Sequence, residues 1–168
     1  LTLVLALCGS LLLLPVSAAE DSDTPSKAEI REMWRNVTTA TEIFQETPST
    51  SAPYKAGKLT DEYLQTGLTY INYVRFVAGL PAVTLDNTLN ADAQHGAVLM
   101  AAEDDFSHFP AQPSDMDDTF YNRGLDATST SNIFCSYGYG VNELLKTATL
   151  SFMDDDDAYN NDVVGHRR

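Results

Sequence analysis

The sequence predicts a domain that combines several α-helices with a small amount of β-structure. Of its 168 residues, 43% are hydrophobic and 20% are charged, which is the composition of a globular protein of one domain. Apolar residues recur at helical spacing in several stretches, whereas β-forming residues gather in Ser131–Tyr139. Short helices and one or two extended segments are therefore expected to share a single core.

The N-terminal stretch is predicted to be a signal peptide over residues 1–19. Leu1–Leu14 is almost continuously apolar and is followed by a small-residue site, with cleavage expected after Ala18 or Ala19. The apolar run is too short for a comfortable membrane span. An initiator Met and a basic n-region are missing, so we expect the sequence to be truncated at its start. After cleavage Cys135 is the only remaining cysteine, which excludes an internal disulfide and favours export from a bacterium.

Residues 20–58 are predicted to form an acidic leader, a helix and a linker ahead of the main domain. Ser26 and Glu29 have the spacing of a capping box, and the helix is expected to run from there to about Glu46. Thr47–Lys58 is rich in Thr, Ser, Pro and Gly, which is typical of a linker.

The main domain is predicted over residues 59–168. Thr60 and Asp86 are suitable caps for two helices, the first ending at Gly79 and Pro81. The remaining predictions, in chain order, are a short extended Ala82–Leu85, a loop over Glu103–Thr130, β-structure in Ser131–Tyr139 and a helix over Val141–Met153. The acidic run Asp154–Asp157 ends that last helix, where negative charge is unfavourable, and this conflict points to a function.

The charge of the chain excludes some partners. With 24 acidic and 10 basic residues the formal net charge is −14. Binding to nucleic acid depends on Lys and Arg, and anionic membrane surfaces attract basic segments, so neither is an expected partner. Divalent cations are compatible with such a charge.

Few residues are available for catalysis or metal binding. The three histidines are His95, within a predicted helix, His108, in a predicted loop, and His166, near the end of the chain. Each alone is more often structural, but two of them together with carboxylates would make a divalent metal site or an acid–base pair. Cys135 would need a base brought to it by the fold, and an idle thiol is the preferred interpretation. Asp154–Asp157 lacks the alternating ligands of a Ca²⁺ loop.

Several motifs in order resemble the CAP superfamily of cysteine-rich secretory, antigen 5 and pathogenesis-related proteins, in particular its bacterial branch. The resemblance covers about residues 60–168. Its motifs are Asn72-x-x-Arg75, Gly79–Asp86, Leu89-Asn90-x-x-Ala93-Gln94-His95, Ser107-His108 and Gly165–Arg168. It implies an α+β fold, an α-β-α sandwich, which would be incomplete here because the family continues into further strands after the second histidine.

The resemblance also implies a cleft with two histidines and two acidic residues that can bind Zn²⁺ or another divalent cation. Its histidines correspond to His108 and His166. Of the acids, one position is occupied by Ser131, beside Asn132, so that both are expected to line the cleft. The other acid corresponds best to Asp155, with Asp154 and Asp156 as alternatives. A site of two His and one Asp would be weaker than the complete set.

Three functions remain open from the sequence. The first is a secreted, non-catalytic binding module for a small apolar ligand, a cell-wall component or a protein partner. The second is a metal-dependent extracellular hydrolase or peptidase that uses His108 and His166. The third is an envelope protein that docks through residues 26–46. The sequence shows no dedicated nucleophile or general base, and this counts against an enzyme.

Overall fold

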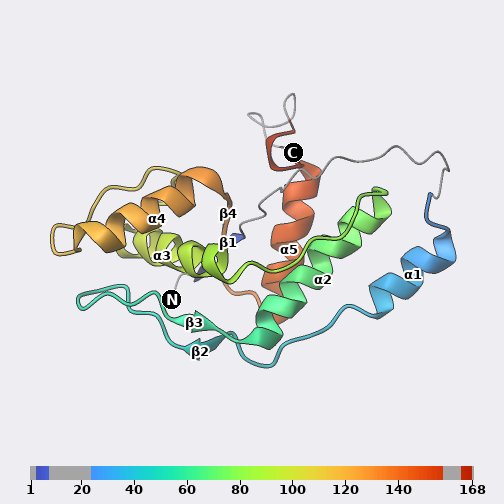
Figure 1. Ribbon diagram of the computed structural model, residues 1–168, viewed down its shortest axis with the longest axis horizontal. Coiled ribbons are helices and arrows are strands. Elements are labelled where there is room, and N and C mark those ends of the chain that lie inside the picture. The colour runs from blue at the N-terminus through green and yellow to red at the C-terminus, as the bar shows by residue number, and fades with distance from the viewer. Residues whose placement is uncertain (1–2, 8–23, 157–163, 168) are drawn as a thin grey trace.

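The computed structural model describes residues 3–7, 24–156 and 164–167, which form five helices and two small sheets (Figure 1). This arrangement is α+β, as predicted. The predicted signal peptide lies outside the described residues except for 3–7, and so does the proposed cleavage site. The elements in chain order are β1 (Leu3–Leu7), α1 (Lys27–Arg35), β2 (Phe44–Glu46), β3 (Lys58–Leu59), α2 (Asp61–Val77), α3 (Asn87–Glu103), α4 (Asp118–Thr130), β4 (Asn132–Ser136), α5 (Val141–Asp154) and a 3-10 turn, η1 (Gly165–Arg167).

Helices pack on both sides of the β1–β4 pair. The two strands run antiparallel with Leu3 opposite Ser136 and Leu7 opposite Asn132. α3 packs on β1 and α4 packs on α3, whereas α5 contacts β4 and α2 packs on α5. In Figure 1 the α3–α4 pair lies to one side of this sheet, and α2 and α5 cross on the other side. The layers are compatible with the α-β-α order that the family resemblance implies.

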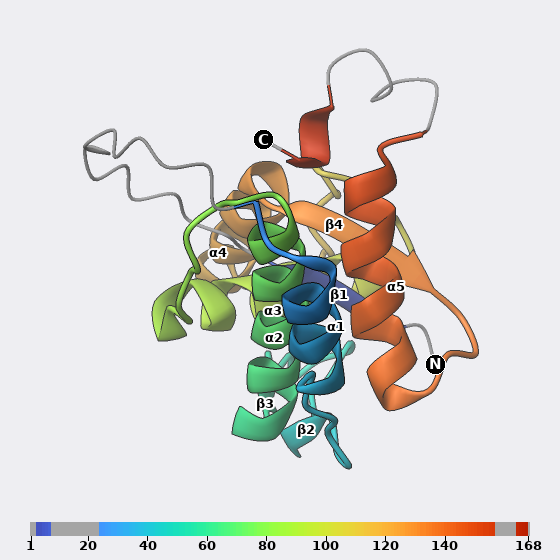
Figure 2. The same ribbon diagram turned by 90° about the vertical axis from the view of Figure 1, so that its right-hand side faces the viewer.

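The core has two parts, of which one joins α3 to β4 through Ala97, Met100 and Ile133, and the other lies where α2, α5 and the segment before α2 meet. Tyr63 and Tyr70 of α2 and Leu145 of α5 are buried together with Ala40 and Leu59. Ala40 belongs to residues 36–43, which were expected to continue the first helix. Figure 2 shows α1 and α2 side by side next to α5.

The expected helix to Glu46 is wrong beyond Arg35. The Ser26–Glu29 capping box is present, as predicted, but the helix is capped at Asn36. The chain then extends across α2 and α5, where the Asn142 side chain accepts from the Ala40 N–H (2.7 Å) and donates to the Ala40 carbonyl (3.0 Å). Since β2 pairs with β3, residues 47–57 form the connection of a hairpin. Contacts that are distant in sequence override the local helical pattern here.

The expected loop over Glu103–Thr130 is wrong in its second half, where α4 begins at Asp118. The Asp117 side chain caps this helix by accepting from the N–H groups of Thr119 and Phe120, both at 3.0 Å. Asp117 and the following Asp118 are the usual acidic signature of a helix start, which the density of Ser, Pro and Asp in this region concealed. The segment Ala82–Leu85 forms no strand, whereas β4 and α5 occur where they were predicted.

We expect Asn142→Ala to lower the free energy of unfolding by about 1–3 kcal/mol, because it removes two partly buried hydrogen bonds to the backbone of Ala40. Chemical denaturation would measure the loss. Asn122→Ala, an exposed substitution on α4, is the matched control and should change stability little. Equal stability of the two variants would contradict the role given to Asn142.

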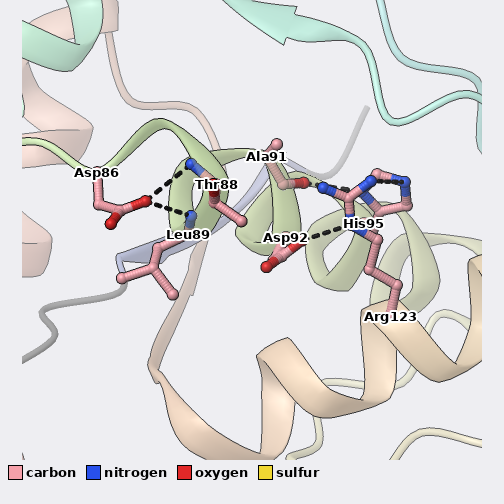
Figure 3. Close-up of polar contacts among 7 residues, drawn as sticks. All are labelled: Asp86, Thr88, Leu89, Ala91, Asp92, His95 and Arg123. Carbon is pink, nitrogen blue, oxygen red and sulfur yellow. Dashed lines mark hydrogen bonds and ion pairs between the residues drawn. The ribbon is translucent and has the colours of Figure 1, made fainter.

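His95 belongs to a polar cluster that links α3 to α4 (Figure 3). Its Nδ1 donates to the Ala91 carbonyl (2.7 Å), and its Nε2 lies 3.5 Å from Nη1 of Arg123. Arg123 also forms an ion pair with Asp92 of α3, and Phe120 of α4 packs against the imidazole. Burial, together with the nearby Arg123 charge, lowers the pKa of His95 below its ordinary value of 6.5, although Ala91 and Asp92 oppose this shift.

The lowered pKa of His95 predicts that acid destabilises the fold. Below about pH 6.5 the unfolded chain binds a proton at this position more readily than the folded chain does, so the free energy of unfolding decreases as the pH falls. Above that pH both states are neutral here and the contribution vanishes. Denaturation of wild type and His95→Gln between pH 7.5 and 5 would test this, since the wild type should lose more stability than the variant. Equal losses of stability in the wild type and in His95→Gln would contradict this prediction.

Candidate functional site

A cleft of about 460 Å³ opens between β4, the end of α5 and the loop that follows α3. Its two histidines, His108 and His166, are almost 60 residues apart in the sequence. The described residues that line it are Phe106, Ser107, His108, Ile133, Phe134, Cys135, Ser151, Phe152, Asp156 and His166. About half of this wall is apolar or aromatic, and the other half consists of the polar side chains of Ser107, His108, Ser151, Asp156 and His166. An apolar surface with convergent polar groups is typical of a small-ligand site.

His108 is held by α4. Its Nδ1 lies 2.6 Å from the carbonyl oxygen of Thr128, and the Thr128 hydroxyl donates to the His108 carbonyl (3.0 Å). A carbonyl can only accept, so Nδ1 carries the proton in this bond and Nε2 is the ring nitrogen left for a ligand. Since the Thr128 side chain is fully buried, both bonds have a rigid anchor.

His166 is held by the end of α5. Its Nδ1 lies 2.5 Å from an oxygen of the Asp155 carboxylate, and its ring stacks on Phe152 with centroids 5.2 Å apart. The side-chain amide of Asn132 donates to the His166 carbonyl (3.0 Å), which attaches η1 to β4 as well. The carboxylate again engages Nδ1 and leaves Nε2 as the nitrogen available to a ligand.

The Asp155 side chain accepts hydrogen bonds from η1 and thereby attaches η1 to the end of α5. Asp155 caps α5 in the left-handed conformation (φ 44°), and its side chain is fully buried. Besides the imidazole it accepts from the backbone N–H of His166 (3.4 Å) and of Arg167 (3.2 Å). Burial alone would raise the pKa of Asp155, but the hydrogen bonds from His166 and Arg167 together lower it below its ordinary value. The residue is therefore a carboxylate over the physiological range.

The structure places the other sequence-predicted residues as follows. Ser131 is buried, and its hydroxyl has no hydrogen-bond partner among the described residues. Neither Ser131 nor Asn132 is part of the cleft wall, whose β4 residues begin at Ile133. Within residues 3–7, 24–156 and 164–167, no three His, Cys, Asp or Glu side chains lie close enough together to hold a metal ion. His95 lies outside the cleft, between α3 and α4.

Several contributors to this cleft were not predicted from the sequence. Phe152 forms the stacking wall, Thr128 anchors His108, and Cys135 lines the pocket. The Cys135 pKa is raised by burial and by the Asp104 charge, so its thiol stays protonated at neutral pH. Of these three residues, only Phe152 could have been found from the sequence, because it is an aromatic residue three positions before Asp155 at the end of the same helix.

The comparison with protein families decides the identity of this domain. The family profile described as CAP, the cysteine-rich secretory protein family, matches residues 68–168. The chain belongs to the CAP family. This confirms the resemblance on which the two-histidine cleft was predicted, and both histidines of the cleft lie within the CAP match. Proteins of the CAP family are generally extracellular.

The other comparisons add no relative. No curated protein and no solved structure matches this CAP chain significantly. In the part of the chain that the structure describes, no helix is long and apolar enough to cross a membrane.

Proposed function

We propose that the chain is a secreted CAP-domain binding module, non-catalytic, whose cleft accepts a small extracellular ligand and, through His108 and His166, a divalent cation. The observation that supports the proposal most is the hydrogen-bonding pattern that the two imidazoles share. In each imidazole that lines the cleft, Nδ1 donates to an oxygen acceptor and Nε2 is left for a ligand. Metal-binding histidines are usually held in this way.

The donor set suits Zn²⁺ in part. Imidazole nitrogen is a good zinc ligand, and an Asp–His pair such as Asp155–His166 fixes the ring and strengthens it as a donor. In this proposal Asp155 orients His166 and does not bind the metal, because its oxygens already accept from His166 and Arg167. Water or a ligand group would complete the coordination, so we expect a weak site.

The two alternatives find less support. A cysteine hydrolase would need an activated nucleophile, and the Cys135 thiol in the cleft wall is protonated because burial raises its pKa. A docking role for residues 26–46 conflicts with the burial of Ala40 in the core and with its hydrogen bonds to Asn142. Both observations favour a binding cleft within the CAP domain.

The experiment that tests the proposal is NMR of the imidazole rings during titration with Zn²⁺. Zinc should shift the Nε2 resonances of His108 and His166 and leave both Nδ1 atoms protonated. His95 provides an internal control, because its Nε2 faces Arg123 outside the cleft. Unchanged resonances for His108 and His166, or coordination through Nδ1, would contradict the proposal.

A further inference from the structure

The β1–β4 pair joins two segments that lie far apart in the sequence. The strands run antiparallel, with Val4 of β1 opposite Cys135 of β4. In the part of the chain that the structure describes, β1 is the only strand that pairs with β4. Figure 1 shows the two strands side by side, between the α3–α4 pair and α5. Removal of residues 1–19, the predicted signal peptide, would therefore leave β4 without a partner strand.

The surface of α3 that packs on this sheet is apolar. Ala97 and Met100 of α3 form a buried cluster with Ile133 of β4, and Ala101 packs against the same cluster. Another face of α3 is already occupied, since Gly96 approaches α4 closely. α3 also packs on β1, so that loss of β1 would uncover part of α3 as well as the edge of β4. We call this edge of β4, together with the apolar face of α3, the strand seat.

The strand seat has none of the features that usually protect an open sheet edge. Unpaired N–H and C=O groups along an edge strand are a template for another strand, and charged residues or proline commonly block such pairing. β4, with the sequence Asn-Ile-Phe-Cys-Ser, contains neither a charged residue nor proline. An uncovered seat would therefore combine unpaired backbone groups with exposed apolar surface, and both favour the binding of a new strand.

The strand that fills the seat in the full chain indicates which chemistry fits it. Its sequence, Leu-Val-Leu-Ala-Leu, is uncharged and wholly apolar. In strand addition the main-chain hydrogen bonds provide affinity, and the side chains provide specificity. A second copy of β4 is a poorer match, because its ends, Asn132 and Ser136, are polar and because two chains of net charge −14 repel each other.

We propose that the strand seat, once residues 1–19 are removed, binds an extended, uncharged apolar segment of at least five residues from another polypeptide. The bound segment runs antiparallel to β4 and takes the register that residues 3–7 have in the full chain. The site is formed by backbone edges and α3, and it does not depend on the two histidines of the cleft.

Cys135 of β4 reports directly on the register of the strand seat. In the full chain with Cys8→Ser, which removes the only other cysteine, Val4→Cys should form a disulfide with Cys135 in oxidised glutathione, because these positions are register partners. Leu5→Cys is the matched control. It lies one position further along β1, and because successive positions of a strand alternate between faces, it should form little or no disulfide. Equal yields, or no disulfide in Val4→Cys, would overturn the proposal.

The same disulfide tests whether a separate strand can bind. A protease site inserted between Ala19 and Glu20 of the Cys8→Ser chain allows residues 1–19 to be cut off after folding. An excess of a synthetic peptide of residues 1–7 with Val4→Cys, carrying additional lysines at its C-terminus for solubility, should then become linked to Cys135, one peptide per chain. The corresponding peptide with Leu5→Cys should not. Linkage by neither peptide, or equal linkage by both, would overturn the proposal.

A charged peptide tests the apolar character of the seat. Ala6→Lys, introduced into the Val4→Cys peptide, places a charge opposite the buried Ile133 and should weaken binding at least about tenfold, although the net negative charge of the protein attracts it. Binding of both peptides with equal affinity would overturn the apolar specificity. Dimers of the cut chain linked through Cys135, in place of peptide adducts, would assign the seat to a second copy and would also overturn the proposal.

Discussion

Gly124→Val should lower the free energy of unfolding by about 1–3 kcal/mol or more, because it separates the two most extensively packed helices. A Cβ atom at Gly124 of α4 would lie 3.0 Å from the carbonyl oxygen of His95 and 3.2 Å from its carbon. These are backbone atoms of α3 and cannot move without the helix. Gly96 approaches α4 in the same way, with a Cβ only 3.0 Å from Thr128 and 3.2 Å from the Gly124 oxygen.

Gly67→Ala is the matched control for the Gly124 prediction. Gly67 lies within α2, where a Cβ would meet only the Leu145 side chain at an ordinary 3.5 Å. Alanine should be neutral or stabilise α2 by up to about 1 kcal/mol because of its higher helix propensity. Chemical denaturation of both variants would measure the contrast. Wild-type stability of Gly124→Val would show that α3 and α4 do not pack as closely as described.

Asp155→Ala should weaken Zn²⁺ binding by about ten- to one-hundred-fold, although the proposal places this residue outside the metal's own ligands. Without the carboxylate, Nδ1 of His166 and the backbone N–H groups of His166 and Arg167 lose their common acceptor. η1 is then attached to β4 by Asn132 alone. The ring loses its fixed tautomer and orientation, and Nε2 is no longer presented to the cleft.

The neighbouring carboxylate provides the control for Asp155. Asp154→Ala changes the net charge equally, but the Asp154 residue is exposed and none of its side-chain contacts hold His166 among the described residues. Its affinity for Zn²⁺ should remain near that of the wild type. Asn in place of Asp155 should give an intermediate affinity, since an amide oxygen still accepts from Nδ1 but carries no charge. An equal loss of Zn²⁺ affinity in Asp154→Ala and Asp155→Ala would contradict the specific role of Asp155, because the change of net charge alone would then explain the loss.

Local signals predicted most helices and the family. Helix caps and β-forming runs depend on residues that are neighbours in the sequence, so they can be found without the fold. The caps Ser26, Thr60 and Asp86 and the strand β4 were predicted in this way. The path of residues 36–46 could not be predicted, because it depends on Asn142, which lies 102 positions after Ala40. The helix α4 was missed for a different reason, since its capping signal is embedded in a polar, loop-like composition.

For the site, family motifs selected His108 and His166, and the structure brings both to one cleft. What they could not provide is the orientation of the rings. Thr128, which fixes His108, lies in a helix that was not expected. Asp155 was expected to bind a metal, and its position depends on the left-handed cap of α5, so its contact with His166 emerges only from the fold.

Calorimetric titration with Zn²⁺ tests whether His108 and His166 together form one cation-binding cleft. We expect about one Zn²⁺ per wild-type chain and a loss of affinity of at least about tenfold in both His108→Ala and His166→Ala. His95→Ala, the control for a histidine outside the cleft, should bind as the wild type does. Absence of binding in the wild type, or equal affinity in all four proteins, would show that the two histidines do not form a cation site.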